Sequence, residues 1–224
     1  MVSPHGSGDT VLESPSLEVE HKLWLKGYQR VAGVDEVGRG ALAGPLVASA
    51  VVLPSHRADL RAVLDKVRDS KQLTASTREE LYPVICQTAL AVGTGLASPC
   101  FIDRCGIVEA TRRAMIMALR NLNVQVDYVL IDALSLPSPE TPQLSLIRGD
   151  VQVLSIAAAS IVAKVTRDHW MVALDRYYTG YAFACNKGYG TPYHLAALRR
   201  LGACPAHRMS FSPLCGYSSS ASKR

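Results

Sequence analysis

Two adjacent acidic residues, Asp35 and Glu36, interrupt an apolar segment that otherwise has the pattern of a buried β-strand over Val31–Val37. An ionised carboxylate in such a strand loses its hydration, so a cation or hydrogen-bond donors must compensate its charge. Side chains alternate along a strand, so one acid can instead cap a turn while the other faces solvent. A bend at Gly38 would weaken that alternative, and both interpretations stay open.

Apolar spacing predicts both strands and helices around this segment. A β-branched run between Pro45 and Pro54 predicts a second strand over Leu46–Leu53, joined to the first by a glycine-rich turn. The longest predicted helix, Ser155–Tyr177, begins with small residues that permit close packing on a sheet. We expect one α/β domain with a mixed central sheet flanked by helices. The other predicted helices are Glu18–Gly27, Thr74–Ala89, Ile107–Leu122 and Thr191–Leu201, and the other predicted strands are Leu90–Ser98 and Asp127–Asp132.

Two further acids, Asp132 and Asp150, lie at the ends of predicted elements. An acid at a strand end is often a solvated loop residue, although ligands also bind at such ends in open α/β sheets. Asp150 precedes the longest helix, where it can simply favour the positive N-terminal end. Together with Asp35 and Glu36, however, these acids would repel one another unless divalent cations neutralised them. Oxygen ligands suit Mg²⁺ or Mn²⁺, and a pair of such ions about 3.5–4 Å apart can hydrolyse a phosphodiester.

Composition sets broader limits. The 224 residues, of which 48% are hydrophobic and 19% charged, suffice for one large globular domain. No apolar stretch reaches the roughly 20 residues needed to cross a bilayer, and no secretory signal is visible, so we expect a cytoplasmic protein without a membrane span. The six cysteines lack zinc-ligand spacing, which predicts reduced, mostly buried thiols. The net charge of +5 suits a polyanionic partner but is too common to decide the function.

The motif Val-Asp-Glu-Val-Gly-Arg-Gly over Val34–Gly40 closely resembles that of bacterial ribonuclease HII, a type 2 ribonuclease H. The resemblance continues in the family's order and covers roughly Val31–Pro213. The matching blocks are Asp69–Leu73, Val129–Asp132, Arg148–Asp150, Ala158–Val165, Lys187–Tyr189 and His207–Pro213.

This resemblance implies a ribonuclease H-like fold and a metal-dependent endoribonuclease. The implied enzyme cuts the RNA strand of RNA–DNA hybrids and incises at ribonucleotides embedded in duplex DNA, leaving 5′-phosphate and 3′-hydroxyl ends. The implied cofactor is Mn²⁺ or Mg²⁺, with two ions in each active site when substrate is bound. The implied catalytic and metal-binding carboxylates are Asp35, Glu36, Asp132 and Asp150.

Residues 1–20 are rich in Ser, Gly, Pro and Glu and have no apolar periodicity. We expect a flexible leader over residues 1–20, a catalytic domain over 21–217 and a short flexible tail over 218–224, in a protein that acts as a monomer. Asp168 lies one turn after Lys164 on the longest predicted helix, and we interpret it as an intrahelical ion-pair partner.

The family match implies that the turn formed by Gly38, Arg39 and Gly40 contacts the ribonucleotide's 2′-hydroxyl. Glycine allows the main chain to approach a sugar closely, and the 2′-hydroxyl distinguishes RNA from DNA. An ordinary tight turn is the alternative. Tyr189 resembles the family tyrosine that stacks on the sugar following the ribonucleotide and so senses an RNA-to-DNA junction. A tyrosine beside glycines is otherwise usually a packing residue.

Basic and polar residues in other blocks have simpler alternatives. Ser70 and Lys71 are placed to touch backbone phosphates, although a lone lysine is more often only solvated. His207 and Arg208 either contact phosphate or anchor the C-terminal segment.

The sequence departs from the commonest family pattern at three positions. Asn186 stands where a histidine is frequent, Ala133 where glycine is usual, and Arg68 where asparagine is usual. None is a presumed metal ligand, so these changes bear on loop geometry and substrate affinity.

Two other functions compete with the nuclease. A binding module that senses embedded ribonucleotides without cutting is one alternative, against which the complete acidic set argues. A metal-dependent phosphatase acting on small molecules is the other, and nothing in the sequence suggests a closed pocket for such a substrate.

Overall fold

The computed structural model describes residues 14–137 and 141–216. A five-stranded sheet lies at its centre in the order β3-β2-β1-β4-β5. Strand β1 pairs antiparallel with β2 and parallel with β4, which confirms the predicted mixed sheet. The strands are β1 (Val31–Val37), β2 (Leu46–Val52), β3 (Ala91–Ala97), β4 (Tyr128–Asp132) and β5 (Gln143–Leu146).

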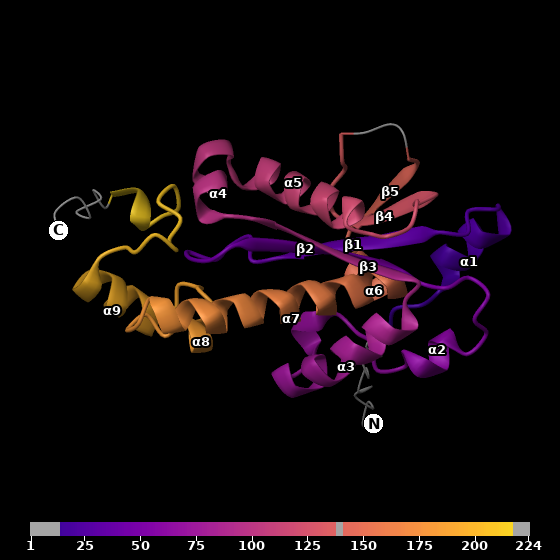
Figure 1. The fold of residues 1–224 in the computed structure, drawn as a ribbon, viewed down its shortest axis with the longest axis horizontal. Coiled ribbons are helices and arrows are strands. Elements are labelled where there is room, and N and C mark those ends of the chain that lie inside the picture. Colours follow the sequence, from indigo (N-terminus) through magenta and orange to yellow (C-terminus); the bar gives the residue numbers. More distant parts are fainter. Residues whose placement is uncertain (1–13, 138–140, 217–224) are drawn as a thin grey trace, which may run out of the picture.

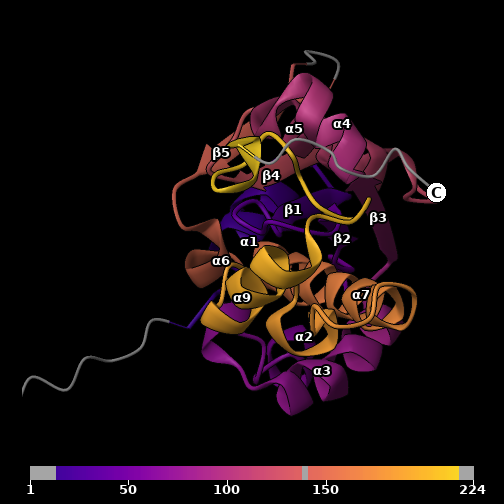
Figure 2. The ribbon, with the colours of Figure 1, turned by 90° about the vertical axis from the view of Figure 1, so that its left-hand side faces the viewer.

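Helices cover both faces of this sheet (Figure 1). Helix α5 (Ile107–Arg120) packs on β2 and β3, and α7 (Leu154–Tyr177) packs on β1 and β2 from the other side. Viewed end-on in Figure 2, the sheet lies between these layers, with α9 (Pro192–Leu201) in front. The other helices are α1 (Glu18–Leu25), α2 (Leu60–Val63), α3 (Ala75–Thr88), α4 (Pro99–Cys105), α6 (Gly149–Gln152), α8 (Phe183–Asn186), and the 3₁₀ turns η1 (Ser70–Gln72) and η2 (Leu214–Gly216).

Helix α7 lies directly on β1 because small residues line the contact. Ala157, Ala158 and Ser160 of α7 are each at most 3% exposed. A Cβ atom added at Gly33 of β1 would lie 2.3 Å from the main-chain carbonyl carbon of Ser155, far inside van der Waals contact. Glycine at this position therefore sets how closely helix and sheet approach.

The first described residues are tied to the start of α7. Ser16 bridges to Val153, and its carbonyl accepts the Leu154 N–H at 3.0 Å. The buried Glu20 carboxylate accepts the Ser155 N–H at 2.9 Å and so caps the helix from outside. Residues 14–20 thus belong to the folded part of the chain, earlier than the predicted start at residue 21. Residues 1–13 and 218–224, which complete the predicted leader and tail, lie outside the described residues.

The cysteines correct one expectation. All six are free, Cys204 is half-buried and the other five are exposed, so the prediction of mostly buried thiols was wrong. The apolar character of cysteine does not force burial where the residue falls on the outer side of a helix or turn, as Cys86 does on α3.

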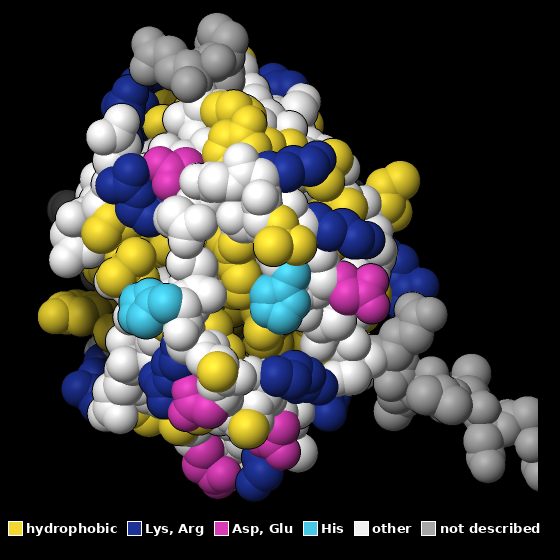
Figure 3. Space-filling model, turned by 90° about the vertical axis from the view of Figure 1, so that its right-hand side faces the viewer, with side chains coloured by type: hydrophobic (Ala, Val, Ile, Leu, Met, Phe, Trp, Pro, Cys, Tyr) yellow, Lys and Arg dark blue, Asp and Glu magenta, His cyan; other side chains and the backbone are white. Residues whose placement is uncertain are grey.

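Two features of the molecule bear on its possible environments and partners, namely the membrane-crossing potential of the helices and the distribution of charge on the surface. No helix in the described part of the chain combines the length and apolar character needed to cross a membrane. On the face drawn in Figure 3, Lys and Arg side chains are interspersed with Asp and Glu, so the net positive charge forms no continuous patch there.

Replacing Gly33 with alanine should destabilise the protein by about 3 kcal/mol or more, because the new methyl group overlaps the main chain of α7. Urea unfolding followed by circular dichroism measures this change. Gly40→Ala is the matched control, since an added Cβ there has no atom within 4 Å. Equal unfolding midpoints for the two variants would contradict the close approach of α7 to β1.

Candidate active site

Three of the predicted carboxylates stand at the ends of two neighbouring parallel strands. Asp35 and Glu36 lie near the end of β1, and Asp132 is the last residue of β4. Val34 pairs with Ile131, so Asp35 and Asp132 are the next residues along the two strands. The strand register by itself therefore brings these acids to one edge of the sheet.

Asp150 reaches the same edge through the turn after β5. The chain turns at Arg148, whose φ of 57° is left-handed, into the short helix α6. The Gly149 N–H donates to Oδ1 of Asp132 at 2.7 Å, so Asp150 directly follows a residue bound to Asp132. Asp150 is 4% exposed, and Val153 separates its helix from α7. It is therefore a buried group beside Asp132 and not a solvated charge at the start of the long helix.

Asp35 and Glu36 occupy opposite faces of β1, as strand alternation requires. Asp35 is 5% exposed and accepts a hydrogen bond from the Ser160 hydroxyl of α7. Glu36 is half-buried, and its Oε1 accepts a hydrogen bond from Arg39 Nη1 at 3.3 Å. Asp132 nevertheless repels both acids, because all three lie where the strands end.

The environment of these acids disfavours their ionised forms. Burial raises the pKa of Asp35 well above its usual value, and repulsion from Glu36 adds to this shift. Burial also raises the pKa of Glu36, although the Arg39 guanidinium opposes it. At Asp132 burial raises the pKa, the Gly149 N–H opposes the shift, and Asp150 adds repulsion. The four carboxylates thus act on one another as one electrostatic cluster.

Two cationic side chains of the chain compensate part of this negative charge. Lys71 Nζ lies 3.3 Å from Asp150 Oδ2, and Arg39 Nη1 lies 3.3 Å from Glu36 Oε1. The other oxygen of Glu36, Oε2, is buried and has no hydrogen-bond partner among the described residues. Within residues 14–137 and 141–216, no three or more His, Cys, Asp and Glu side chains are already arranged to hold a metal ion. The cluster therefore keeps uncompensated charge, although Asp150 pairs with Lys71 and Glu36 with Arg39.

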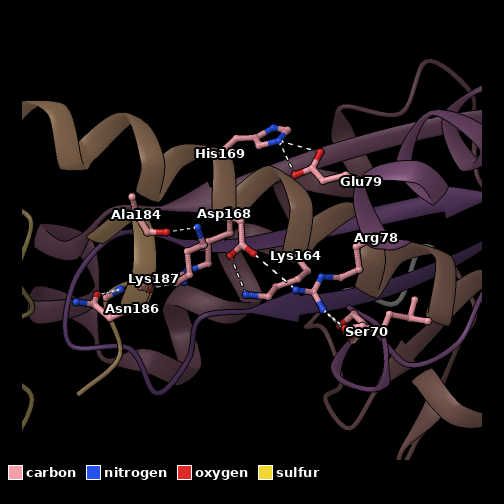
Figure 4. A network of polar contacts seen from close by, with 12 residues as sticks. Ser70, Arg78, Glu79, Lys164, Asp168, His169, Ala184, Asn186 and Lys187 are labelled. Carbon is pink, nitrogen blue, oxygen red and sulfur yellow. Dashed lines mark hydrogen bonds and ion pairs between the residues drawn. The ribbon is translucent and has the colours of Figure 1, made fainter. Parts of the chain in front are cut away.

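The turn that carries Ser70 and Lys71 is fixed to α7 and α3. Ser70 Oγ lies 2.8 Å from Ser160 Oγ, within hydrogen-bond distance. Arg78 of α3 donates through Nη1 to the carbonyls of Ser70 and Leu73 at 2.8 and 2.6 Å (Figure 4). Ser70 is 5% exposed, whereas the Lys71 side chain is 78% exposed. Ser70 is therefore a buried contact of Ser160, the residue that bonds to Asp35. Of the two residues of this turn, Lys71 is the one whose side chain is open to solvent.

Asp168 is confirmed as an ion-pair partner separate from the cluster. Its Oδ1 lies 2.7 Å from Lys164 Nζ one turn earlier on α7, and its Oδ2 lies 4.0 Å from Arg78 Nη2 (Figure 4).

The glycine-rich turn and Tyr189 belong to two segments in direct contact. Gly38 has a φ of 91°, which residues with side chains rarely adopt. The main-chain N–H groups of Leu42 and Ala43 donate to the Gly188 carbonyl at 2.8 and 3.2 Å. Tyr189 is half-buried, while the two residues after Gly38, Arg39 and Gly40, are exposed. The glycine-rich turn with the residues that follow it and the segment around Tyr189 are therefore held together, and we call them the recognition unit.

His207 and Arg208 anchor the C-terminal segment. They are 2% and 0% exposed. Arg208 donates to the Gly44 carbonyl at 3.1 and 2.9 Å and to the Arg39 carbonyl at 3.0 Å. Because both side chains are buried, neither can reach a phosphate. The alternative that these residues anchor the C-terminal segment is therefore confirmed.

The three departures from the family pattern affect loops around the cluster. Asn186 donates to the Tyr181 carbonyl at 2.6 Å and accepts the Gly188 N–H at 2.8 Å, so it shapes the turn before Tyr189. Ala133 has a φ of 54°, a conformation that glycine adopts without strain. Arg68 folds back on its own loop and donates to the Val67 carbonyl at 2.8 Å.

Sequence reasoning did not assign a role to Ser160 or Arg167. Ser160 was noted only as a small residue of the packing face, yet a hydroxyl in a buried helix face needs a partner, and that requirement could have pointed to Asp35. Arg167 is 0% exposed. An arginine in a helix is usually solvated, so the sequence carries little signal for this one.

Solved structures identify the class of fold. The ribonuclease H2 of Pyrococcus horikoshii OT3 has a TM-score of 0.70 at 26% identity, covering 83% of this chain and 95% of that chain. The structure described as Bst-RNase HIII in complex with Mn²⁺ has a TM-score of 0.63 at 21% identity, covering 94% and 75%, and this likeness shows the fold alone. The protein has an α/β ribonuclease H-like fold.

Sequence comparison identifies the family within this class. The sequence model of the family described as Ribonuclease HII matches residues 32–214. The ribonuclease HII of Chloroflexus aggregans is 51% identical over 201 residues, which are 90% of this chain and 95% of that relative. The chain belongs to the ribonuclease HII family, whose members are metal-dependent enzymes with ribonuclease H activity.

Replacing Asp35 with asparagine should stabilise the protein by about 1–2 kcal/mol at neutral pH in the presence of a chelator. The folded-state pKa of Asp35 is raised, so ionisation penalises the folded state at high pH, and this penalty is lost as the pH falls toward the usual pKa of aspartate. Thermal unfolding at pH 7 and pH 4 measures the difference between the two proteins. A gain that does not shrink at pH 4 would show that the carboxylate charge is not its cause.

Proposed function

We propose that this protein is an endoribonuclease that cuts the RNA strand of RNA–DNA hybrids and incises at ribonucleotides embedded in duplex DNA. The observation that carries the proposal is the cluster of Asp35, Glu36, Asp132 and Asp150 at the ends of β1 and β4 and in α6. Membership of the ribonuclease HII family supports it. That the protein acts as a monomer in the cytoplasm stays a prediction from the sequence.

The four carboxylates would hold two divalent cations, Mn²⁺ or Mg²⁺. Their hard oxygen donors suit these ions, and the raised pKa values and unpaired Glu36 Oε2 are features that a cation would relieve. Such ions, when bound, lower the pKa of the attacking water and stabilise the departing oxygen. Incision on the 5′ side of the ribonucleotide, with 5′-phosphate and 3′-hydroxyl ends, follows the family resemblance.

The chain's own groups orient the carboxylates and reach toward the substrate. The Ser160 hydroxyl holds Asp35, and the Gly149 N–H holds Asp132. Lys71 would move from Asp150 to a backbone phosphate once cations neutralise the acid, and its exposed side chain has the freedom to do so.

Recognition of the ribonucleotide is assigned to the unit formed by the glycine-rich turn and Tyr189. Gly38, Arg39 and Gly40 would place main-chain groups against the 2′-hydroxyl, and Tyr189 would stack on the next sugar. The hydrogen bonds from Leu42 and Ala43 to Gly188 support this assignment, because they couple the two segments.

Replacing Asp132 with asparagine should reduce cleavage more than about 100-fold, since losing even an outer partner of a metal ligand costs 10–100-fold. A labelled DNA duplex with one ribonucleotide, incubated with Mn²⁺, reports cleavage, and a gel shift reports binding. Asp59→Asn is the matched control because the Asp59 side chain is exposed and pairs with Arg57, away from the four carboxylates. Binding without cleavage by the unsubstituted protein would favour the alternative of a non-catalytic ribonucleotide sensor.

Replacing Tyr189 with alanine should lower the preference for an RNA-to-DNA junction about tenfold, equivalent to ~1.4 kcal/mol. The reason is that the ring excludes a 2′-hydroxyl from the sugar that follows the cleaved ribonucleotide. The preference is the ratio of kcat/KM on a single-ribonucleotide duplex to kcat/KM on a continuous RNA–DNA hybrid. Tyr193→Ala, at a 59% exposed position on α9, is the control. An unchanged ratio in Tyr189→Ala would remove the junction-sensing role.

A further inference from the structure

Arg167 is a fully buried cation in the middle of α7, on the side of the helix that meets the two recognition segments. Its side chain is 0% exposed. Removing a guanidinium from water is costly, so its charge needs close acceptors. The identity of those acceptors shows what this residue holds in place.

Three main-chain carbonyls from two separate segments accept hydrogen bonds from Arg167. Nε donates to Pro45 at 2.9 Å and Nη2 to Ala43 at 3.1 Å, both in the segment that follows the glycine-rich turn. Nη1 donates to Lys187 at 2.8 Å, in the segment that precedes Tyr189. The planar guanidinium therefore bridges the two segments with a fixed geometry.

The same side chain contacts the recognition residues themselves. Its Cζ lies 5.3 Å from the centre of the Tyr189 ring, which is a cation–π distance. A Cβ atom added at Gly38 would lie 2.2 Å from Nε of Arg167, so the bend of the glycine-rich turn rests on this guanidinium. Arg167 thus touches both the turn assigned to the 2′-hydroxyl and the ring assigned to the following sugar.

The helix around Arg167 is also fixed to α3 through its neighbour Asp168. Asp168 pairs with Lys164 and Arg78, and Arg78 holds the Ser70 turn that supports Asp35 through Ser160 (Figure 4). Arg167 therefore fixes the glycine-rich turn and the Tyr189 segment. Its neighbour Asp168 pairs with Arg78, which fixes the Ser70 turn beside the acidic cluster.

We propose that Arg167 is a positioning residue that sets the Tyr189 ring relative to the Gly38 turn and thereby determines the preference for RNA-to-DNA junctions. This inference rests on the proposed function, because it presumes that Tyr189 senses the junction. Lysine cannot replace Arg167 in this role. An ammonium group is compact and lacks the fork that reaches three carbonyls and lies over the ring at once.

The test compares Arg167→Lys and Arg167→Met with the unsubstituted protein. The measurement is the ratio of kcat/KM on a single-ribonucleotide duplex to kcat/KM on a continuous hybrid. We expect this ratio to fall about tenfold in both variants, with kcat on the continuous hybrid within about threefold of the original. Arg176→Met, at an exposed position on the same helix, is the matched control and should leave the ratio unchanged.

A double-mutant cycle with Tyr189→Ala separates positioning from a general structural effect. If Arg167 acts through the ring, Arg167→Lys should lower the ratio no further in a chain that already carries Tyr189→Ala. A folded Arg167→Lys variant with an unchanged ratio, or fully additive effects in the double variant, would overturn the inference. If Arg167→Met does not fold, the cycle with Arg167→Lys decides the question alone.

The cycle also distinguishes failure of this inference from failure of the proposed function. An unchanged ratio in Tyr189→Ala would show that Tyr189 does not sense the junction, and the inference would fall with that assignment. A lowered ratio in Tyr189→Ala with an unchanged ratio in Arg167→Lys would refute the role of Arg167 alone. Cleavage of neither duplex by the unsubstituted protein would refute both.

Discussion

Helix α7 can lie directly on β1 because Gly33 leaves no side chain between the strand and the helix backbone. This contact places Ser160 against Asp35 near the start of the helix and Arg167 against the glycine-rich turn farther along it. The same helix carries Asp168, which reaches Arg78 and through it the Ser70 turn. One close helix-to-sheet contact therefore fixes both the support of the carboxylates and the recognition unit.

The acidic cluster shows how the fold accommodates charges that oppose burial. Burial raises the pKa values of Asp35, Glu36 and Asp132, and their mutual repulsion adds to the shift at Asp35. Lys71 and Arg39 compensate Asp150 and Glu36, but they do so from exposed positions with weak, solvent-screened interactions. The cluster therefore stays electrostatically unsatisfied within the chain itself, a condition that bound cations would relieve.

The sequence predicted those parts of the fold that depend on regular apolar periodicity. The strands β1 to β4 and the long helices were found because runs such as Leu46–Val52 are buried along their whole length. Strand β5 was missed because its four residues have no apolar run and owe their conformation to pairing with β4. The short helices α4 and α6 were missed for a similar reason, since neither is long enough to show a period.

The carboxylates of the site were predictable from the sequence, but the residues that hold them were not. Its carboxylates could be named because acids in apolar segments are conspicuous and match a family motif. The groups that hold them could not, because their roles depend on tertiary contacts. The sequence left open whether Arg208 contacts phosphate or anchors the C-terminal segment, and only its bonds to the Gly44 and Arg39 carbonyls decide this. Ser70 was predicted to touch a backbone phosphate, yet it is 5% exposed and lies within hydrogen-bond distance of Ser160.

Two of the described residues that combine a side chain with a left-handed backbone, Ala133 and Arg148, lie beside the buried carboxylates. Ala133, the residue after Asp132, adopts a left-handed conformation that costs a residue with a side chain about 1 kcal/mol. Its N–H donates to the Leu146 carbonyl at 2.9 Å, which closes the pairing of β4 with β5 directly beside the acid. The face of α7 that packs on β1 contains small buried residues, as in Ala157 to Ala159. Backbone strain next to buried carboxylates is expected where the geometry of a site is maintained at the expense of stability.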